Sequence, residues 1–204
     1  MHIEFLVEEP SAEAALKNLV PIILGQDVSF VIHPHQGKQD LLAKLTGRLK
    51  GYKAWLPEDW RIVVLIDGDN KDCRELKDKL ERIAHDAGLM TQSAVLMGSK
   101  FQVLNRLAIE ELEAWFFGDI EALNAAYPRV SLRNLNKAKY RNPDAIAGGT
   151  WEALERELQR VSYHPGGLAK VSAAREISAH IDPERNRSKS FQVFRQGLLE
   201  LVGD

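Results

Sequence analysis

The first hundred residues alternate between short apolar runs and longer segments with helical spacing. The apolar runs cover residues 3–7, 28–33, 61–66 and 91–97. Between them, segments that start near Pro10, Gly37 and Cys73 repeat apolar residues every three or four positions, as amphipathic helices do. Strands that alternate with helices form parallel sheets with right-handed crossovers. This pattern predicts a Rossmann-like α/β fold, with a parallel sheet of about four strands flanked by helices.

After residue 100 the pattern becomes mostly helical. The expected helices cover residues 110–117, 120–126, 150–161, 168–181 and 190–202. The run 103–109 fits either a fifth strand or the start of a helix. The chain therefore divides into an α/β domain over 1–100 and a mainly helical C-terminal region over 101–204 that packs on it.

Composition narrows the class of protein. The 204 residues, 45% apolar and 27% charged, are ordinary for a globular protein of this size. A net charge of −2 argues against a surface basic all over for nucleic acid, but leaves room for a local basic patch. The single cysteine, Cys73, excludes an internal disulfide framework and favours a reducing, cytoplasmic compartment. We expect neither a signal peptide nor contact with a membrane, since no window approaches the ~20 apolar residues of a span.

Carboxylates gather where two of the predicted strands end. The stretch "VVLIDGDNKD" puts Asp67 and Asp69 directly after an apolar run, separated by Gly68, and Glu8 closes the first run. In a parallel sheet, ligands bind beyond the carboxyl ends of the strands. Three carboxylates that converge there raise one another's pKa unless a cation lies among them, and hard oxygen ligands favour Mg²⁺ or Mn²⁺. The sequence thus predicts a metal site of Glu8, Asp67 and Asp69.

A simpler explanation is that these acids cap a helix. Asp69 or Asp72 could accept hydrogen bonds from the first amides of the helix that follows. The convergence with Glu8 favours the metal.

These residues resemble a known domain. "FLVEEPSAEAAL" and "VVLIDGDNKDC" resemble the Toprim domain of topoisomerases, primases and OLD-type nucleases, over about residues 1–100. With "HQGKQDLL", "AIEELEAWFFGD" and "KAKYRNPDAI", nearly the whole chain is similar to a family of small bacterial proteins of unknown function allied to OLD-type Toprim proteins. Glu9 stands where Toprim proteins carry glycine.

The resemblance implies a function. Asp67 and Asp69 would hold Mg²⁺, and Glu8 would act as a metal ligand or as the general acid/base in phosphodiester chemistry. It further implies a nuclease that works with a separate ATPase subunit, in defence against foreign DNA. The sequence fixes no oligomeric state.

Other residues suggest contacts beyond the metal. Glu110 and Glu113 form a second acidic cluster if they share a helical face turned to the site; the alternative is a solvated face. Lys38 follows Gly37 at a helix start and is a candidate phosphate contact, although the P-loop pattern is incomplete, which excludes that class of NTPase. Zinc is not expected at His33 and His35, because no third soft ligand accompanies them.

A basic stretch lies in the second half. Residues 122–143 contain no acidic residue, and basic and aromatic side chains there suit a phosphate backbone. The candidate nucleic-acid contacts are Arg133, Lys137, Lys139 and Arg141. A solvated loop is the alternative.

Two further classes of function stay open. One is a catalytically silent binding or regulatory module whose acidic site is degenerate, which Glu9 in place of glycine supports. The other is a receiver-like phosphoacceptor domain, which also places acids after its first and third strands but needs a Ser/Thr and a Lys at separate later strand ends. Ser99 and Lys100 are adjacent and do not meet that need.

Overall fold

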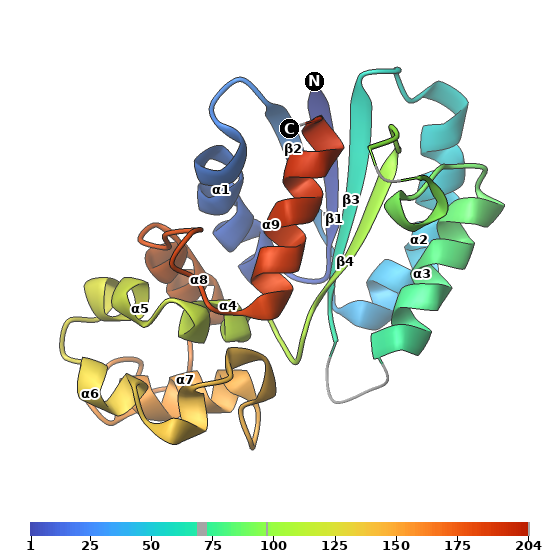
Figure 1. Cartoon of the computed structure of the whole chain (residues 1–204). Coiled ribbons are helices and arrows are strands. Elements are labelled where there is room, and N and C mark those ends of the chain that lie inside the picture. The colour runs from blue at the N-terminus through green and yellow to red at the C-terminus, as the bar shows by residue number, and fades with distance from the viewer. Residues whose placement is uncertain (69–72, 97, 204) are drawn as a thin grey trace.

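The protein contains one parallel four-stranded sheet (Figure 1). The computed structural model describes residues 1–68, 73–96 and 98–203. The strands are β1 (His2–Val7), β2 (Ser29–Pro34), β3 (Trp60–Asp67) and β4 (Val103–Ala108), in the order β2-β1-β3-β4. Every neighbouring pair is parallel, which confirms the predicted α/β class. Since β1 lies beside β3, the residues that follow these two strands emerge next to each other.

Helices cover both faces of the sheet. On one face, α1 (Pro10–Leu24) and α9 (Lys189–Val202) share a hydrophobic core with Phe5 and Val63. On the other, α2 (Lys38–Trp55) and α3 (Cys73–Asp86) share a second core with Leu6 and Val64. Figure 1 shows the two layers on either side of the strands. Burial on both faces explains why the strand over 61–66 is apolar without alternation.

The fourth strand differs from the one expected over 91–97. Thr91 makes one isolated bridge to Val103, and the chain then forms a short 3-10 helix, η1 (Gln92–Ala94). The strand that completes the sheet is β4, in the run left open between strand and helix. Val103 and Leu104 are fully buried on opposite faces, whereas Leu96 is 83% exposed, so only the later run gains burial by pairing. Met97 lies outside the described residues.

The second half places a group of short helices beyond the carboxyl ends of the strands (Figure 1). These are α4 (Glu113–Gly118), α5 (Ile120–Ala126), α6 (Leu132–Leu135), α7 (Thr150–Gln159) and α8 (Lys170–Ser178), with 3-10 turns η2 (Ala138–Tyr140) and η3 (Pro143–Ala145). This confirms the mainly helical C-terminal region. Trp115 of α4 packs against Phe191 and Phe194 of α9, which joins these helices to the sheet layer. Among the described residues, no helix is both long and apolar enough to cross a membrane.

Candidate functional site

Glu8 and Asp67 meet at the carboxyl edge of the sheet. Val7, the last residue of β1, lies opposite Leu65 of β3, so Glu8 and Asp67 both lie just beyond this pairing. The backbone N–H of Asp67 donates a hydrogen bond to Oε2 of Glu8, over 3.1 Å. The predicted convergence of the first and third strand ends is therefore present in the fold.

The backbone at Gly68 lies so close to the end of β4 that there is no room for a side chain. Its N–H donates to the carbonyl oxygen of Ala108, over 2.7 Å. A Cβ at this position would lie 2.9 Å from Sγ of Cys73 and 3.2 Å from the carbonyl oxygen of Ala108. A side chain would thus collide with the end of β4 and the start of α3. Asp69 and Asp72, predicted as a metal ligand and a cap, lie outside the described residues.

The carboxylates at this edge perturb one another. Burial raises the pKa of Asp67 well above its ordinary value, and the negative charges of Glu113, Glu8 and Glu9 raise it further. Burial also raises the pKa of Glu113 to about 7, against the opposing effect of Lys170. Glu113 is 1% exposed, and its Oε2 has no hydrogen-bond partner. Burial and neighbouring like charges therefore disfavour the ionised forms of Asp67 and Glu113 at this edge.

Lys170 supplies a cation that the sequence analysis missed. It begins α8, and its Nζ lies 3.7 Å from Oε1 of Glu9 and 4.0 Å from Oε1 of Glu113. The ammonium also lies 5.5 Å from the ring centre of Trp151. Burial lowers the pKa of Lys170, but the carboxylates outweigh that effect and the pKa is raised overall, so this side chain is charged at neutral pH. A single lysine far from the acids in sequence carries no local signal.

A cavity of about 420 Å³ opens among these groups. Its lining consists of Glu8, Glu9, Pro10, His35, Gln36, Gly37, Asp67, Glu111 and Lys170. We refer to it as the acidic cavity. Its residues come from the ends of β1 and β3, the starts of α1, α2 and α8, and the loop after β4, at the edge where parallel α/β folds bind ligands.

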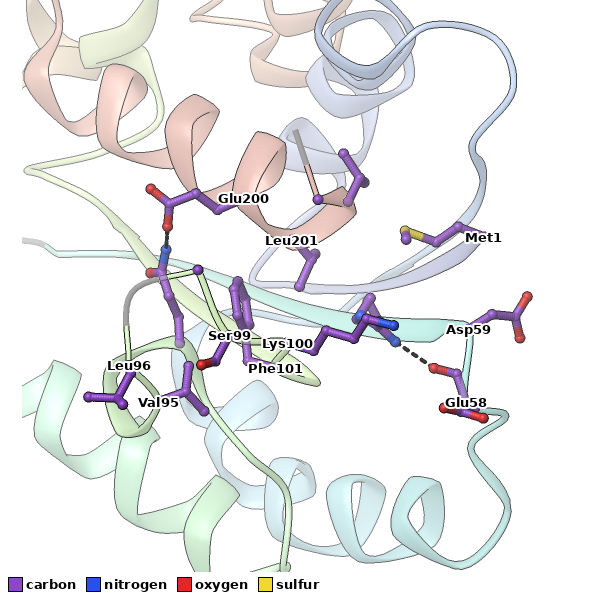
Figure 2. Close-up of a pocket in the computed structure, with 15 residues that line it drawn as sticks. Met1, Glu58, Asp59, Val95, Leu96, Ser99, Lys100, Phe101, Glu200 and Leu201 are labelled. Carbon is purple, nitrogen blue, oxygen red and sulfur yellow. Dashed lines mark hydrogen bonds between the residues drawn. The ribbon is translucent and has the colours of Figure 1, made fainter.

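A larger cavity lies at the opposite end of the strands. It measures about 730 Å³, and residues such as Met1, Asp59 and Phe101, which precede β1, β3 and β4, line it (Figure 2). Its visible hydrogen bonds, from Arg61 to the Glu58 carbonyl and from Gln92 to Glu200, tie neighbouring elements together. Because it contains neither Glu8 nor Asp67, size alone does not identify the functional site.

The second acidic cluster is arranged differently from the prediction. Glu110 and Glu113 do not share a helical face, because α4 begins at Glu113 and Glu110 has a left-handed backbone with φ 62°. The turn that leaves β4 needs this conformation and delays the helix. Glu111 instead caps α7: its Oε2 accepts from the Thr150 N–H, the Thr150 hydroxyl and the Trp151 N–H, over 3.2, 2.7 and 2.9 Å.

Of the predicted phosphate contacts, Lys38 lies next to the lining of the acidic cavity, whereas the four basic residues of the second half do not line it. Lys38 is the first residue of α2 and follows Gly37, which lines the cavity. The basic stretch runs from α5 through α6 and η2, and its four candidate contact residues are exposed. Its residues Arg133, Lys137, Lys139 and Arg141 are all described, and none of them lines the cavity. Lys139 contacts Oε1 of Glu157 at 3.6 Å and the Tyr140 ring at 4.4 Å.

The donor chemistry at the edge fits a hard divalent cation. Glu8 and Asp67 both line the acidic cavity, and the Oε2 of Glu113, whose charge also acts on Asp67, is a buried acceptor without a hydrogen-bond partner. Within the described residues, no group of three acidic, histidine or cysteine side chains is gathered closely enough to hold a metal by itself. Asp69, the third predicted ligand, falls outside that part of the chain.

Comparison with known proteins gives a family. The family model of the domain of unknown function DUF4276 matches residues 7–199. No curated protein and no solved structure matches the chain.

Proposed function

The chain belongs to the DUF4276 family, and we propose that it is a nuclease that uses Mg²⁺ or Mn²⁺ for phosphodiester chemistry on nucleic acid. The observation that carries the proposal is the state of Asp67. Its carboxyl group is partly buried beside the negative charges of Glu113, Glu8 and Glu9, and Lys170 opposes their effect. An ionised carboxylate in these surroundings destabilises the folded protein unless a cation binds there.

The side chains at the edge divide the work. Asp67, together with Asp69, would hold the metal. Bound Mg²⁺ supplies stabilisation of charge on the phosphate and lowers the pKa of water. Glu8, which follows β1, would be either a further metal ligand or the group that holds or moves a proton as the general acid/base. Lys170 keeps the excess carboxylates partly neutralised, so that a polyanion can approach.

The substrate and partners follow from charge and resemblance. An acidic site repels nucleic acid, so the basic stretch with Arg133, Lys137, Lys139 and Arg141 guides the backbone towards it. The resemblance to OLD-type Toprim proteins adds a separate ATPase subunit and a role in defence. These partners are part of the proposal.

One observation favours a second function, a silent binding module. Lys170 already reaches Glu9 and Glu113 and gives the site some of the positive charge that a metal would bring. A family member that had lost metal binding would keep its fold in this way. Such a module would bind its partner equally well with and without Mg²⁺.

Cleavage of labelled oligonucleotides tests the proposed function. The wild-type chain, Asp67→Asn and Asp86→Asn are incubated with single- and double-stranded DNA and RNA, with Mg²⁺, Mn²⁺ or EDTA. Asp86 is an exposed residue at the end of α3 and serves as the matched control. We expect metal-dependent cleavage by wild type and Asp86→Asn, and none by Asp67→Asn. Cleavage that persists in Asp67→Asn would place the activity in a contaminant or at another site.

A further inference from the structure

The two edges of the sheet differ in how they are protected. β2 and β4 are the outer strands, so each has one side that pairs with no neighbouring strand of this sheet (Figure 1). At β4, the carbonyl oxygen of Asn105 accepts from Nζ of Lys77 over 2.7 Å and from Nη1 of Arg106 over 2.9 Å. Cations on an edge strand hinder its pairing with another chain. The sequence of β2, SFVIHP, contains no lysine or arginine and no carboxylate.

The register of β2 directs a set of backbone groups away from the sheet. The N–H groups of Ser29, at the start of the strand, and His35, just beyond its end, donate to the β1 side over 3.3 and 3.0 Å. Alternate residues of a strand bond to the same neighbour, so the N–H and carbonyl groups of Phe30 and Ile32 face outward. In the part of the chain that the structure describes, no residue hydrogen-bonds with these outward groups.

The side chains along this edge are apolar and partly exposed. Phe30 and Ile32 are half-buried and pack against the core on one face of the sheet. Val31 points to the other face and is 43% exposed. The titratable side chain of the strand, His33, is held by a hydrogen bond to Glu4 of β1. An apolar edge strand without charges is a place where a further strand adds.

We propose that β2 pairs with β2 of a second copy of this chain, in antiparallel orientation, so that the two sheets join into one. The two-fold axis passes beside Val31 and places Phe30 of each copy opposite Ile32 of the other. In both pairs the outward N–H and carbonyl groups face each other, and each pair exchanges two hydrogen bonds. The two Val31 side chains meet across the axis. One patch thus satisfies itself, as a two-fold interface requires.

Charge favours a second copy in this orientation. The nearest carboxylate before β2 is Asp27, and the nearest ammonium after it is Lys38, in the first turn of α2. Antiparallel pairing brings the Asp27 end of one copy to the Lys38 end of the other, whereas parallel pairing sets like charges together. Nucleic acid does not fit this edge, because β2 offers no cation to its phosphates.

The dimer fixes the direction of the two acidic cavities. The chain passes from β2 directly into Gln36 and Gly37, which line the cavity. Because the paired strands run in opposite directions, the two cavities lie at opposite ends of the joined sheet. If the chain is a nuclease, each copy acts on its own stretch of nucleic acid. The interface itself does not depend on the proposed function.

Disulfide trapping tests the register. All trapping variants carry Cys73→Ala, which removes the single cysteine of the chain. Val31→Cys places a thiol beside the axis, where the two Cβ atoms lie about 4.5 Å apart and reach a disulfide. Ser29→Cys is the matched control, because it lies on the same exposed face but its two copies are roughly 14 Å apart along the strands.

We expect Val31→Cys to form a covalent dimer under mild oxidation and Ser29→Cys to stay a single chain, as read from a non-reducing gel. A Val31→Cys variant that forms no covalent dimer overturns the inference. Equal cross-linking of the two variants overturns it as well, because random collisions give that result.

Sedimentation equilibrium on the chain without these cysteines measures the association itself. Wild type should shift from the mass of one chain to that of two as its concentration rises. Val31→Lys sets two ammonium groups opposite each other and should weaken association by about tenfold or more. Val193→Lys, at a position 46% exposed on α9, is the control and should match wild type. Circular dichroism verifies that both variants are folded.

Two results of this measurement would contradict the inference. A wild type that stays monomeric at every concentration leaves the β2 edge to an extended segment of another protein. A dimer that Val31→Lys leaves intact, or that Val193→Lys disrupts in its place, puts the interface elsewhere on the molecule.

Discussion

Nζ of Lys170 lies 4.0 Å from Oε1 of Glu113, the most buried carboxylate beside the candidate site. This ammonium lowers the pKa of Glu113, yet burial holds that pKa at about 7. Two elements distant in sequence, α4 and α8, thus meet at a group that titrates near neutral pH. The pair makes the stability of the fold depend on pH.

Glu113→Gln should stabilise the metal-free protein at high pH. The pKa of Glu113 is raised on folding, from an ordinary 4.5 to about 7. Its contribution to the free energy of unfolding is therefore fully present below pH 4.5 and is lost as the pH rises through 7. Glutamine resembles the protonated form, so the variant should equal wild type near pH 4.5 and exceed it by up to ~3 kcal/mol at pH 8.

Thermal melting in EDTA across this pH range measures the difference. Glu58→Gln, at an exposed position before β3, is the control and should track wild type throughout. A constant offset between Glu113→Gln and wild type from pH 4.5 to 8 would mean that Glu113 does not titrate in this window.

Asp67→Asn should abolish the response to metal without harming the fold. In EDTA the substitution removes a charge that Glu113, Glu8 and Glu9 oppose, so stability should stay equal or rise by up to ~2 kcal/mol. Mg²⁺ should raise the melting temperature of wild type and leave the variant unchanged. A variant that melts well below wild type in EDTA would show that Asp67 is a structural carboxylate.

Gly68→Ala should destabilise the protein by roughly 1–3 kcal/mol through crowding. The new Cβ would approach Sγ of Cys73 to 2.9 Å and the Ala108 carbonyl to 3.2 Å. Adding Cys73→Ala removes the first clash only, so recovery should be partial. Gly47→Ala within α2 meets no atom within 4 Å and should stabilise by ~0.5–1 kcal/mol. Chemical denaturation compares the four proteins; no loss in Gly68→Ala would mean that the end of β3 relaxes freely.

Replacing Lys137, Lys139 and Arg141 by Ala should weaken binding of short DNA or RNA. Fewer phosphates would be neutralised, so fewer counterions are released and the slope of log affinity against log salt flattens by up to about three units. Fluorescence anisotropy at several salt concentrations measures both quantities.

Lys50→Ala with Lys79→Ala controls for the loss of exposed charge elsewhere, on α2 and α3. If the triple variant keeps the affinity and the slope of wild type, the basic stretch serves another purpose, such as contact with a partner protein.

The sequence was informative where structure follows from local pattern. Apolar runs identified β1, β2 and β3; for β1 and β3 the reason is that buried parallel strands need apolar residues on both faces, whereas β2 is a more exposed edge strand. The meeting of Glu8 and Asp67 followed from one rule, that parallel strands end at one edge. Locating the fourth strand required knowing which of two neighbouring apolar runs gains burial, and only the tertiary packing of Val103 and Leu104 decides that.

The rest of the site depends on contacts that no spacing encodes. Lys170 and His35 line the acidic cavity from α8 and from the end of β2, and no spacing in the sequence links either residue to Glu8 and Asp67. Glu113 was identified as a candidate, but its burial and the separate role of Glu111 as a cap of α7 arise from the packing of α4. The sequence shows where the charged residues are, but only the fold determines which of them contact one another.

The most direct test of the central claim is the anomalous difference density of a crystal soaked in Mn²⁺. The account predicts a peak at the carboxyl edge of the sheet, coordinated by Glu8 and Asp67, and its absence in crystals of Asp67→Asn. A wild-type crystal at the same Mn²⁺ concentration with no peak beside Asp67, or with a peak only at residues far from Glu8, would contradict the account.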